Sequence, residues 1–137
     1  MALAGVHHVR LPVSDLARST RFWTDDLGYE LNFEFPGTDG PAGLALKHSH
    51  GGPNIVLWHD PARAKLASGF SWLAIGCRSA AEIYDLKDRL DARGIPNGGI
   101  QDALVQIKLP SVEDPDGLLI GFYVVLDDES PVRTAIV

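Results

Sequence analysis

The sequence contains a single cysteine, Cys77, among its 137 residues. No disulfide can form within the chain, so the fold must depend on packing, as is usual in a reducing compartment. The sequence also lacks an apolar run near the roughly 20 residues of a membrane-spanning helix. Its start, MALAGVHHVR, lacks the basic stretch and long apolar segment of a signal peptide. These absences predict a soluble, cytoplasmic protein without a membrane partner.

Basic residues are few, with 12 Lys and Arg against 18 Asp and Glu, and the formal net charge is -6. The basic residues are scattered along the chain, whereas nucleic-acid grooves and sites for anionic membranes need them clustered. Binding to nucleic acid is therefore not expected. With 45% hydrophobic residues, the chain can bury one core of ordinary size, which predicts a single domain.

The first half of the chain follows the pattern βαβββ. Residues 5–13 alternate apolar with other side chains as a strand, and Asp15 begins an amphipathic helix that ends at Gly28. The segment 36–43, PGTDGPAG, is predicted to be a loop. Further strands are predicted over residues 29–35, 44–48 and 54–58.

The second half repeats this pattern. A strand at 70–77 precedes a helix over 79–94, which opens with the capping box Ser79 and Glu82 and closes at Gly94. Strands follow at 98–101, 105–109 and 117–125, and Asp114, Pro115 and Gly117 suit a type I turn before the last of them. Aligning His8 with Trp72 brings the two helices into register, so the chain is an internal duplication. The predicted organisation is a first module at 1–59, a linker at 60–68, a second module at 69–126 and a C-terminal tail at 127–137.

The predicted fold class is α+β, with two βαβββ modules that form curved mixed sheets around a cavity. One face of each sheet packs against the helix of its module. The second face must pack against another surface, either within the same chain or across a dimer. Alternation assigns side chains to these faces. The helix-facing set is Val9, Leu11, Val13, Leu73, Ile75, Cys77, Leu118, Ile120 and Phe122. The set that faces the cavity is His8, Arg10, Asn54, Val56, Trp58, Trp72, Ala74, Leu119, Gly121 and Tyr123.

The duplicated unit, with HVRLPVSDLARSTRFWTDDLGY near its start and DPDGLLIGFYV near its end, resembles the vicinal oxygen chelate superfamily. This superfamily includes glyoxalase I, fosfomycin-resistance enzymes, extradiol dioxygenases and bleomycin-binding proteins. The resemblance covers nearly the whole chain and implies the glyoxalase/bleomycin resistance fold. It does not assign an activity, because members share a scaffold and differ in their sites.

The resemblance also implies where a metal would be bound, since metal-dependent members place ligands on four strand positions that face the cavity. The corresponding residues are His8, Val56, Trp72 and Gly121. The family usually has a histidine near Trp72 and a glutamate near Gly121, where this chain reads WLAI and IGFY. Only His8 has a lone pair to donate, and one ligand cannot hold a catalytic ion. We therefore expect neither a metal nor another cofactor.

Aromatic side chains dominate the predicted cavity. Such walls with a few polar groups are typical of a site for a flat organic ligand. This composition resembles the metal-free bleomycin-binding branch. The expected ligand-binding residues are Val56, Trp58, Trp72, Ala74 and Gly121, with Phe33 and Phe35.

For each of three polar residues the sequence allows two alternative roles. His8 is either a hydrogen-bond donor or general base, or a satisfied polar residue of the wall. Arg10 either clamps an anionic or phenolate ligand or pairs with an acidic residue at the cavity mouth or a dimer contact. Tyr123 either acts as an acid or bonds to the backbone. Cys77 falls on the helix-facing side and is expected to be a small buried hydrophobe.

Three functions follow from these residues. The first is a dimeric, metal-free protein that binds a hydrophobic aromatic small molecule, an antibiotic or a natural-product intermediate. The second is a metal-independent isomerase or cyclase that uses His8 with Arg10 or Tyr123 to move a proton. The third, a metal-dependent glyoxalase or dioxygenase, would need ligands outside the family's positions, from His48, His50 or His59.

Overall fold

The computed structural model describes residues 1–103 and 106–125, so the predicted tail at 127–137 lies outside the described residues. The chain divides into two compact units, residues 1–68 and the residues from 69 onward. The first unit contains β1 (His8–Val13), α1 (Leu16–Arg21), the π-helical η1 (Phe22–Asp26), β2 (Glu30–Pro36), β3 (Pro41–Lys47), β4 (Asn54–His59) and α2 (Pro61–Ala67). The second contains β5 (Ser71–Cys77), α3 (Ala80–Ala92), β6 (Gln101–Ala103), β7 (Gln106–Glu113) and β8 (Leu119–Val124).

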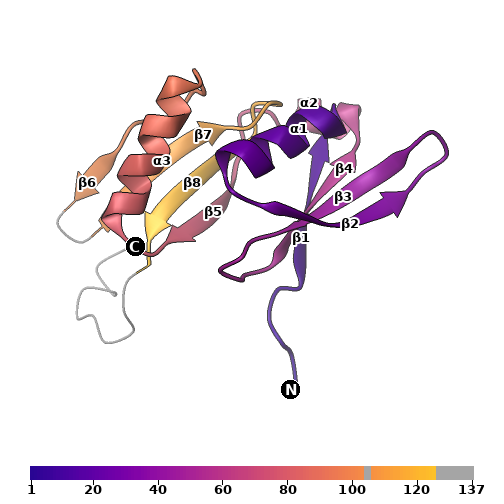
Figure 1. The fold of residues 1–137 in the computed structure, drawn as a ribbon, viewed down its shortest axis with the longest axis horizontal. Helices are drawn as coiled ribbons and strands as arrows, with labels where there is room; N and C mark the ends of the chain where they lie inside the picture. Colours follow the sequence, from indigo (N-terminus) through magenta and orange to yellow (C-terminus); the bar gives the residue numbers. More distant parts are fainter. Residues whose placement is uncertain (104–105, 126–137) are drawn as a thin grey trace. The chain divides into compact units, whose positions relative to one another are not determined.

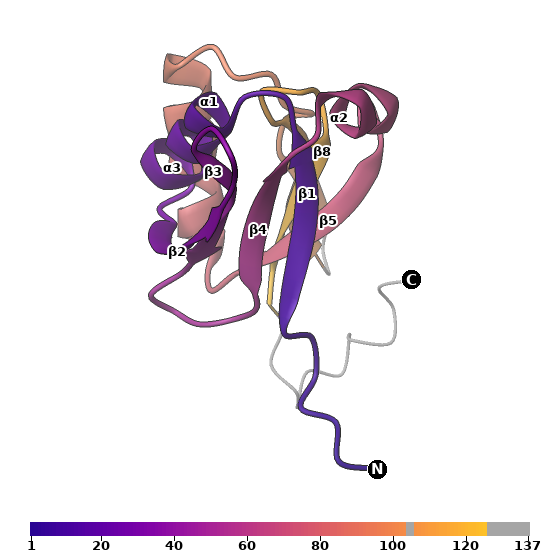
Figure 2. The same ribbon diagram turned by 90° about the vertical axis from the view of Figure 1, so that its right-hand side faces the viewer.

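Each unit holds one mixed four-stranded sheet (Figure 1). The strand orders are β1-β4-β3-β2 and β5-β8-β7-β6. When the strands are numbered within each module, both sheets have the order first, fourth, third, second. In both sheets the first and fourth strands of the module pair in parallel, and the other pairs are antiparallel. Figure 2 shows β1 and β4 side by side. The predicted α+β fold with duplicated βαβββ modules is confirmed.

The helix of the first unit changes its winding after one and a half turns. Asp15 caps α1 by accepting a hydrogen bond from the Arg18 amide at 3.0 Å, as its position predicts. The residues from Phe22 to Asp26 are wound as a π-helix. The hydroxyls of Thr20 and Thr24 donate to carbonyls four residues earlier, a contact that loosens and bends helices. The predicted single helix is therefore two segments of different winding.

The predicted linker contains a helix, α2, that the sequence analysis did not assign. Asp60 accepts a hydrogen bond from the Arg63 amide at 3.1 Å and forms an ion pair with the Arg63 guanidinium at 2.7 Å, and Pro61 occupies the first helical turn. An acidic cap followed by proline is a known helix start. α2 packs against β1, as Figure 2 shows, so this segment is part of the first unit.

The helix of the second unit, α3, begins and ends as predicted. Ser79 accepts a hydrogen bond from the Glu82 amide at 3.3 Å, and the Glu82 carboxylate accepts one from the Arg78 amide. At the other end the amide of Gly94 donates to Asp91 and the amide of Ile95 donates to Leu90. These two bonds form a Schellman motif, which requires a left-handed residue, and Gly94 has a φ of 68°.

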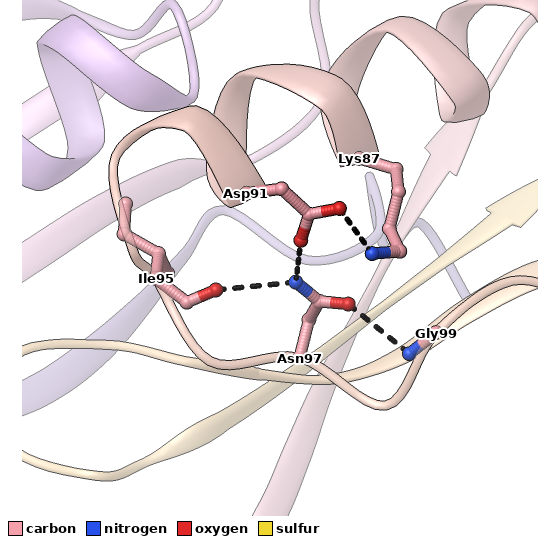
Figure 3. A network of polar contacts seen from close by, with 5 residues as sticks. All are labelled: Lys87, Asp91, Ile95, Asn97 and Gly99. Atoms are coloured by element: carbon pink, nitrogen blue, oxygen red, sulfur yellow. Dashed lines mark hydrogen bonds and ion pairs between the residues drawn. The ribbon is translucent and has the colours of Figure 1, made fainter.

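A polar network ties the end of α3 to the loop that follows it (Figure 3). The Asn97 amide donates to the Asp91 carboxylate at 3.0 Å and to the Ile95 carbonyl at 3.1 Å, and its oxygen accepts from the Gly99 amide. Lys87 forms an ion pair with the same carboxylate. The hydrogen bonds from Lys87 and from Asn97 hold the pKa of the Asp91 carboxyl below its usual value. The network positions the chain for β6, which runs over Gln101–Ala103 instead of the predicted 98–101.

Each sheet buries one face under its helix. α1 contacts β3 and β4, and α3 contacts β5, β7 and β8. The side chains with the lowest exposure include Leu11, Val13, Trp23, Leu46 and Leu57 in the first unit and Ile83, Leu90, Leu109, Val112 and Ile120 in the second. The buried residues of β1 and β8 include Leu11, Val13, Ile120 and Phe122, in agreement with the predicted helix-facing set. Within the described residues, no helix is long and apolar enough to span a membrane.

Candidate ligand site

The second face of the first sheet gathers aromatic residues from β2 and β4. Across β2 and β3, Phe33 pairs with Ala45 and Phe35 with Gly43, and across β3 and β4, Gly43 pairs with Trp58. Paired residues of neighbouring strands lie on the same face of a sheet. We call Phe33, Phe35 and Trp58 the aromatic row.

A β-bulge at Asn32 places the phenylalanines of this row on the second face. Leu31 pairs with Leu46, which is buried in the core, while Phe33 pairs with Ala45 on the opposite side. Without the extra residue, Leu31 and Phe33 would share a face, because side chains alternate with a period of two. The bulge therefore turns Phe33 and Phe35 toward the face that carries Trp58.

The rings of the aromatic row contact one another directly. The ring centroids of Phe33 and Phe35 are 4.9 Å apart, and those of Phe35 and Trp58 are 5.8 Å apart, both in edge-to-face arrangements. Such separations lie within the favourable range for aromatic pairs. The guanidinium carbon of Arg10 lies 4.4 Å from the Trp58 ring centroid. The row thus has an aromatic end on β2 and a cationic end on β1.

Gly43 makes the position of the Trp58 indole possible. A Cβ atom on Gly43 would lie 2.5 Å from Cε3 of Trp58 and 2.8 Å from the Leu57 carbonyl oxygen. No real side chain tolerates such distances, so the close approach of the indole to β3 requires glycine. The predicted loop at 36–43 hides this role, since the structure begins β3 at Pro41.

The aromatic row is partly open. Phe33 is 54% exposed, and Phe35 and Trp58 are half-buried. Phe35 also lines a pocket of about 300 Å³ at the β2–β3 hairpin, with Glu34, Pro36, Gly37, Gly40 and Pro41 as the other lining residues. A ligand on this face would therefore contact ring surface without any rearrangement of the core.

Arg10 is a charged residue in contact with the aromatic row. Its side chain is exposed and contacts the ring of Trp58. Within residues 1–103 and 106–125, no carboxylate forms an ion pair with Arg10. The alternative of an ion pair at the cavity mouth or a dimer contact stays a prediction.

The other predicted residues of the first unit lie near this row or beside it. His8 is exposed at the start of β1, on the same face as Arg10 by alternation, and its Nδ1 lies 2.9 Å from Nδ1 of His7. Val56 pairs with both Arg10 and Ala45, which places it on the second face, but it is only 2% exposed. His48 and His50 lie in the β3–β4 connection, where the His50 amide donates to His48.

The second unit brings together a different group of predicted residues. Ala74 pairs with Gly121, and Gly76 with Tyr123, so small residues line this face. The Lys108 ammonium lies 5.9 Å from the Tyr123 ring centroid. A Cβ atom on Gly121 would lie 3.0 Å from Cε2 of Tyr123. The ring of Tyr123 therefore leans over Gly121 and occupies the space beside this glycine.

Trp72 lies in an irregular part of β5. Ser71 pairs with Leu119 and Leu73 with Ile120, so Trp72 is an extra residue with no partner in β8. Its indole Nε1 is buried and has no hydrogen-bond partner among the described residues. The predicted role of Trp72 in the ligand site stays a prediction.

The four positions that correspond to the family's metal ligands do not provide a metal site. Val56, Trp72 and Gly121 have no donor atom in their side chains for a divalent ion, apart from the protonated indole nitrogen. In the described part of the chain, no three residues among His, Cys, Asp and Glu form a group able to hold a metal ion. The donor set does not fit the metal that the family implies.

Cys77 is not suited to nucleophilic chemistry. Burial, with a smaller contribution from the Glu82 carboxylate, raises the pKa of its thiol from 9.0 to about 11. Reactive cysteines have a lowered pKa, because the thiolate is the nucleophile. Cys77 was predicted to be a small buried hydrophobe, and the structure leaves it half-buried.

Sequence reasoning missed Gly43 and Lys108 as residues of the two faces. An isolated glycine within an apolar strand is a signal for close approach, but Gly43 was assigned to the predicted loop at 36–43. Lys108 was predicted to lie in a strand, but it was not assigned to either face of the sheet. Both assignments depend on the pairing register, which alternation within one strand cannot supply.

Comparison with known proteins agrees with this geometry. Residues 5–122 match the model of the Glyoxalase/Bleomycin resistance protein/Dioxygenase superfamily, and the chain belongs to this superfamily. No curated protein compared with the chain matches it.

Solved structures share the fold over most of the chain. They include TnmS3, an antibiotic binding protein from Streptomyces sp. CB03234, with 22% identity, 92% of this chain and 99% of that chain covered, and a TM-score of 0.73. The fosfomycin resistance protein FosX from Listeria monocytogenes has 16% identity, 91% and 96% coverage and a TM-score of 0.72. A glyoxylase/bleomycin resistance protein/dioxygenase domain from Frankia sp. EAN1pec has 20% identity, 93% and 96% coverage and a TM-score of 0.74. At these identities the likeness extends to the fold alone.

Proposed function

We propose that this chain binds a hydrophobic aromatic small molecule, an antibiotic or a natural-product intermediate, without a metal. The observation that carries the proposal is the aromatic row of Phe33, Phe35 and Trp58, which is continuous and partly open. Flat ligands are commonly held by aromatic side chains with a few polar groups. The antibiotic-binding protein TnmS3, which has the same fold, supports a binding role.

Titration with flat compounds of two and three fused rings, followed by ligand-observed NMR, tests this proposal. Phe35 touches both other rings of the row, so Phe35→Ala should weaken binding about tenfold, the equivalent of one lost aromatic contact. Phe70→Ala removes a phenylalanine that is 63% exposed and outside this sheet, and it should leave binding unchanged. Equal effects of the two substitutions would contradict the assignment of the site.

A metal-independent isomerase or cyclase is the second candidate, and the observation that favours it is the position of His8. His8 is exposed and shares a strand face with Arg10, so a bound molecule with an acidic C–H bond can reach both a base and a cation. Tyr123, the third predicted catalytic residue, belongs to the second sheet. Loss of turnover in His8→Gln with unchanged ligand binding would favour the enzyme over the binding protein.

Three further statements about the whole molecule remain proposals. We propose that the modules at 1–59 and 69–126 form one domain, that the protein is a homodimer, and that it is cytoplasmic. Leu66, which is 85% exposed, is apolar surface that a second copy can cover. Light scattering on the purified chain measures the mass and tests the dimer directly.

A further inference from the structure

We infer that the ligand of the aromatic row is an anion: a flat aromatic molecule that carries a carboxylate or a phenolate and binds Arg10 through it. This inference rests on the function proposed above and specifies the chemistry of the same site. It follows from the position of Arg10, from its lack of an acidic partner in the described residues, and from the charges around it.

The register of the sheet fixes Arg10 beside the aromatic row. Arg10 pairs with Val56 on the neighbouring strand β4, two residues before Trp58, and its guanidinium lies over the Trp58 ring. The cation–π contact orients the guanidinium, but it does not neutralise its charge as a carboxylate would. Arg10 therefore presents a positive charge at one end of the row.

Two other basic residues form ion pairs with carboxylates, whereas Arg10 forms none within the described ranges. Arg63 pairs with Asp60 at 2.7 Å, and Lys87 pairs with Asp91. On the same sheet as Arg10, Lys47 lies opposite Glu30 across β2 and β3. In a chain with a net charge of -6, Arg10 places a positive charge directly beside an aromatic surface.

The geometry suits an aromatic anion better than a neutral ring. Arg10 and Phe35 both contact the indole of Trp58, so one molecule of two fused rings can touch Phe35 and reach the guanidinium with a substituent. The planar guanidinium binds a carboxylate through two parallel hydrogen bonds, and a ring that excludes water on one side strengthens them. A neutral ligand would leave these donors to water alone.

The test compares naphthalene-2-carboxylate with its neutral counterpart, naphthalene-2-carboxamide, by calorimetric titration of the full chain at pH 7. The carboxylate should bind about tenfold more tightly, the usual gain from a hydrogen-bonded charge pair. Arg10→Gln should remove this preference and leave the amide affinity unchanged. Arg21→Gln, which removes an exposed arginine from the end of α1, is the matched control and should keep the preference. Melting curves of both variants check that they fold.

Each result decides between the proposals. Equal affinities of the two probes, both reduced by Phe35→Ala, would overturn the anion inference and leave the aromatic site standing. If Arg10→Gln still bound the carboxylate more tightly than the amide, another cation would bind the anion. That result would also overturn the inference about Arg10. Absence of binding by both probes in the natural chain would count against the proposed function itself.

Discussion

The two modules have the same strand order and opposite characters on their second faces. The first sheet presents three contacting aromatic rings with Arg10 at one end. The second presents Ala74, Gly76 and Gly121 with the ring of Tyr123 folded over the glycine. Topology is set by turns, caps and buried alternation, which both halves retain, while the second face is free to change. This difference is why we propose that ligand binding is a property of the first module's second face.

The largest difference we expect between the modules concerns their cores. Leu11 and Ile75 are corresponding positions, but Leu11 is 1% exposed and Ile75 is half-buried. Leu11→Ala should lower the free energy of unfolding by about 2–5 kcal/mol, the range for fully buried sites, because it removes packing and leaves a cavity. Ile75→Ala should cost less. Denaturant unfolding of both variants measures this, and equal losses would show that the modules are packed alike.

The second comparison concerns the two glycines under aromatic rings. A methyl group on Gly43 meets the Trp58 ring and a backbone oxygen below 3.0 Å, whereas on Gly121 it meets only the outer part of the Tyr123 ring, at 3.0 Å. Gly43→Ala should therefore destabilise by about 1–3 kcal/mol, as overpacking does, and weaken aromatic binding. Gly121→Ala should be close to neutral, since the phenol can turn away. Thermal unfolding with and without ligand separates these outcomes, and a larger cost at Gly121 would reverse the comparison.

These glycines also show where prediction from sequence succeeded and where it could not. Helix caps such as Ser79 and Gly94 were found because their signals are local in the chain. The Asp114 turn was found for the same reason: the Gly117 amide donates to the Asp114 carbonyl at 2.9 Å. Alternation also gave the buried face of β1 correctly.

The remaining errors concern pairing between strands. Bulges at Asn32 and Trp72 insert one residue relative to the partner strand. The alternation of side chains within one strand does not determine how that strand pairs with its neighbour, so these bulges could not be predicted from it. Phe33 and Phe35 were proposed for the site by composition, and the bulge at Asn32 is the physical reason that they reach it. α2 was missed although its cap at Asp60 and its proline were visible, because the segment was interpreted as a linker.

The smallest expected effect compares Cys77 with Val13, its counterpart in the first module. The pKa of about 11 leaves far less thiolate than an ordinary thiol at pH 8, so Cys77 should react with iodoacetamide about a hundredfold more slowly in the folded protein. Because the folded pKa lies above the unfolded value of 9.0, the unfolded chain loses this proton first, and stability should fall between pH 9 and about 11. Cys77→Val, which restores the residue of the first module, should abolish that part of the pH dependence. Rapid modification at pH 8 would contradict the partly buried position.

The most direct test of the central claim is a two-dimensional NMR titration of the labelled chain with naphthalene-2-carboxylate. The account predicts saturable shifts at the Trp58 indole N–H and at the backbone amides of Arg10, Phe35 and Gly43, which lie on neighbouring strands of the first sheet. The indole of Trp23, which is fully buried in the core, should not respond. Shifts confined to the second sheet, around Ala74 and Tyr123, would contradict the assignment of ligand binding to the aromatic row.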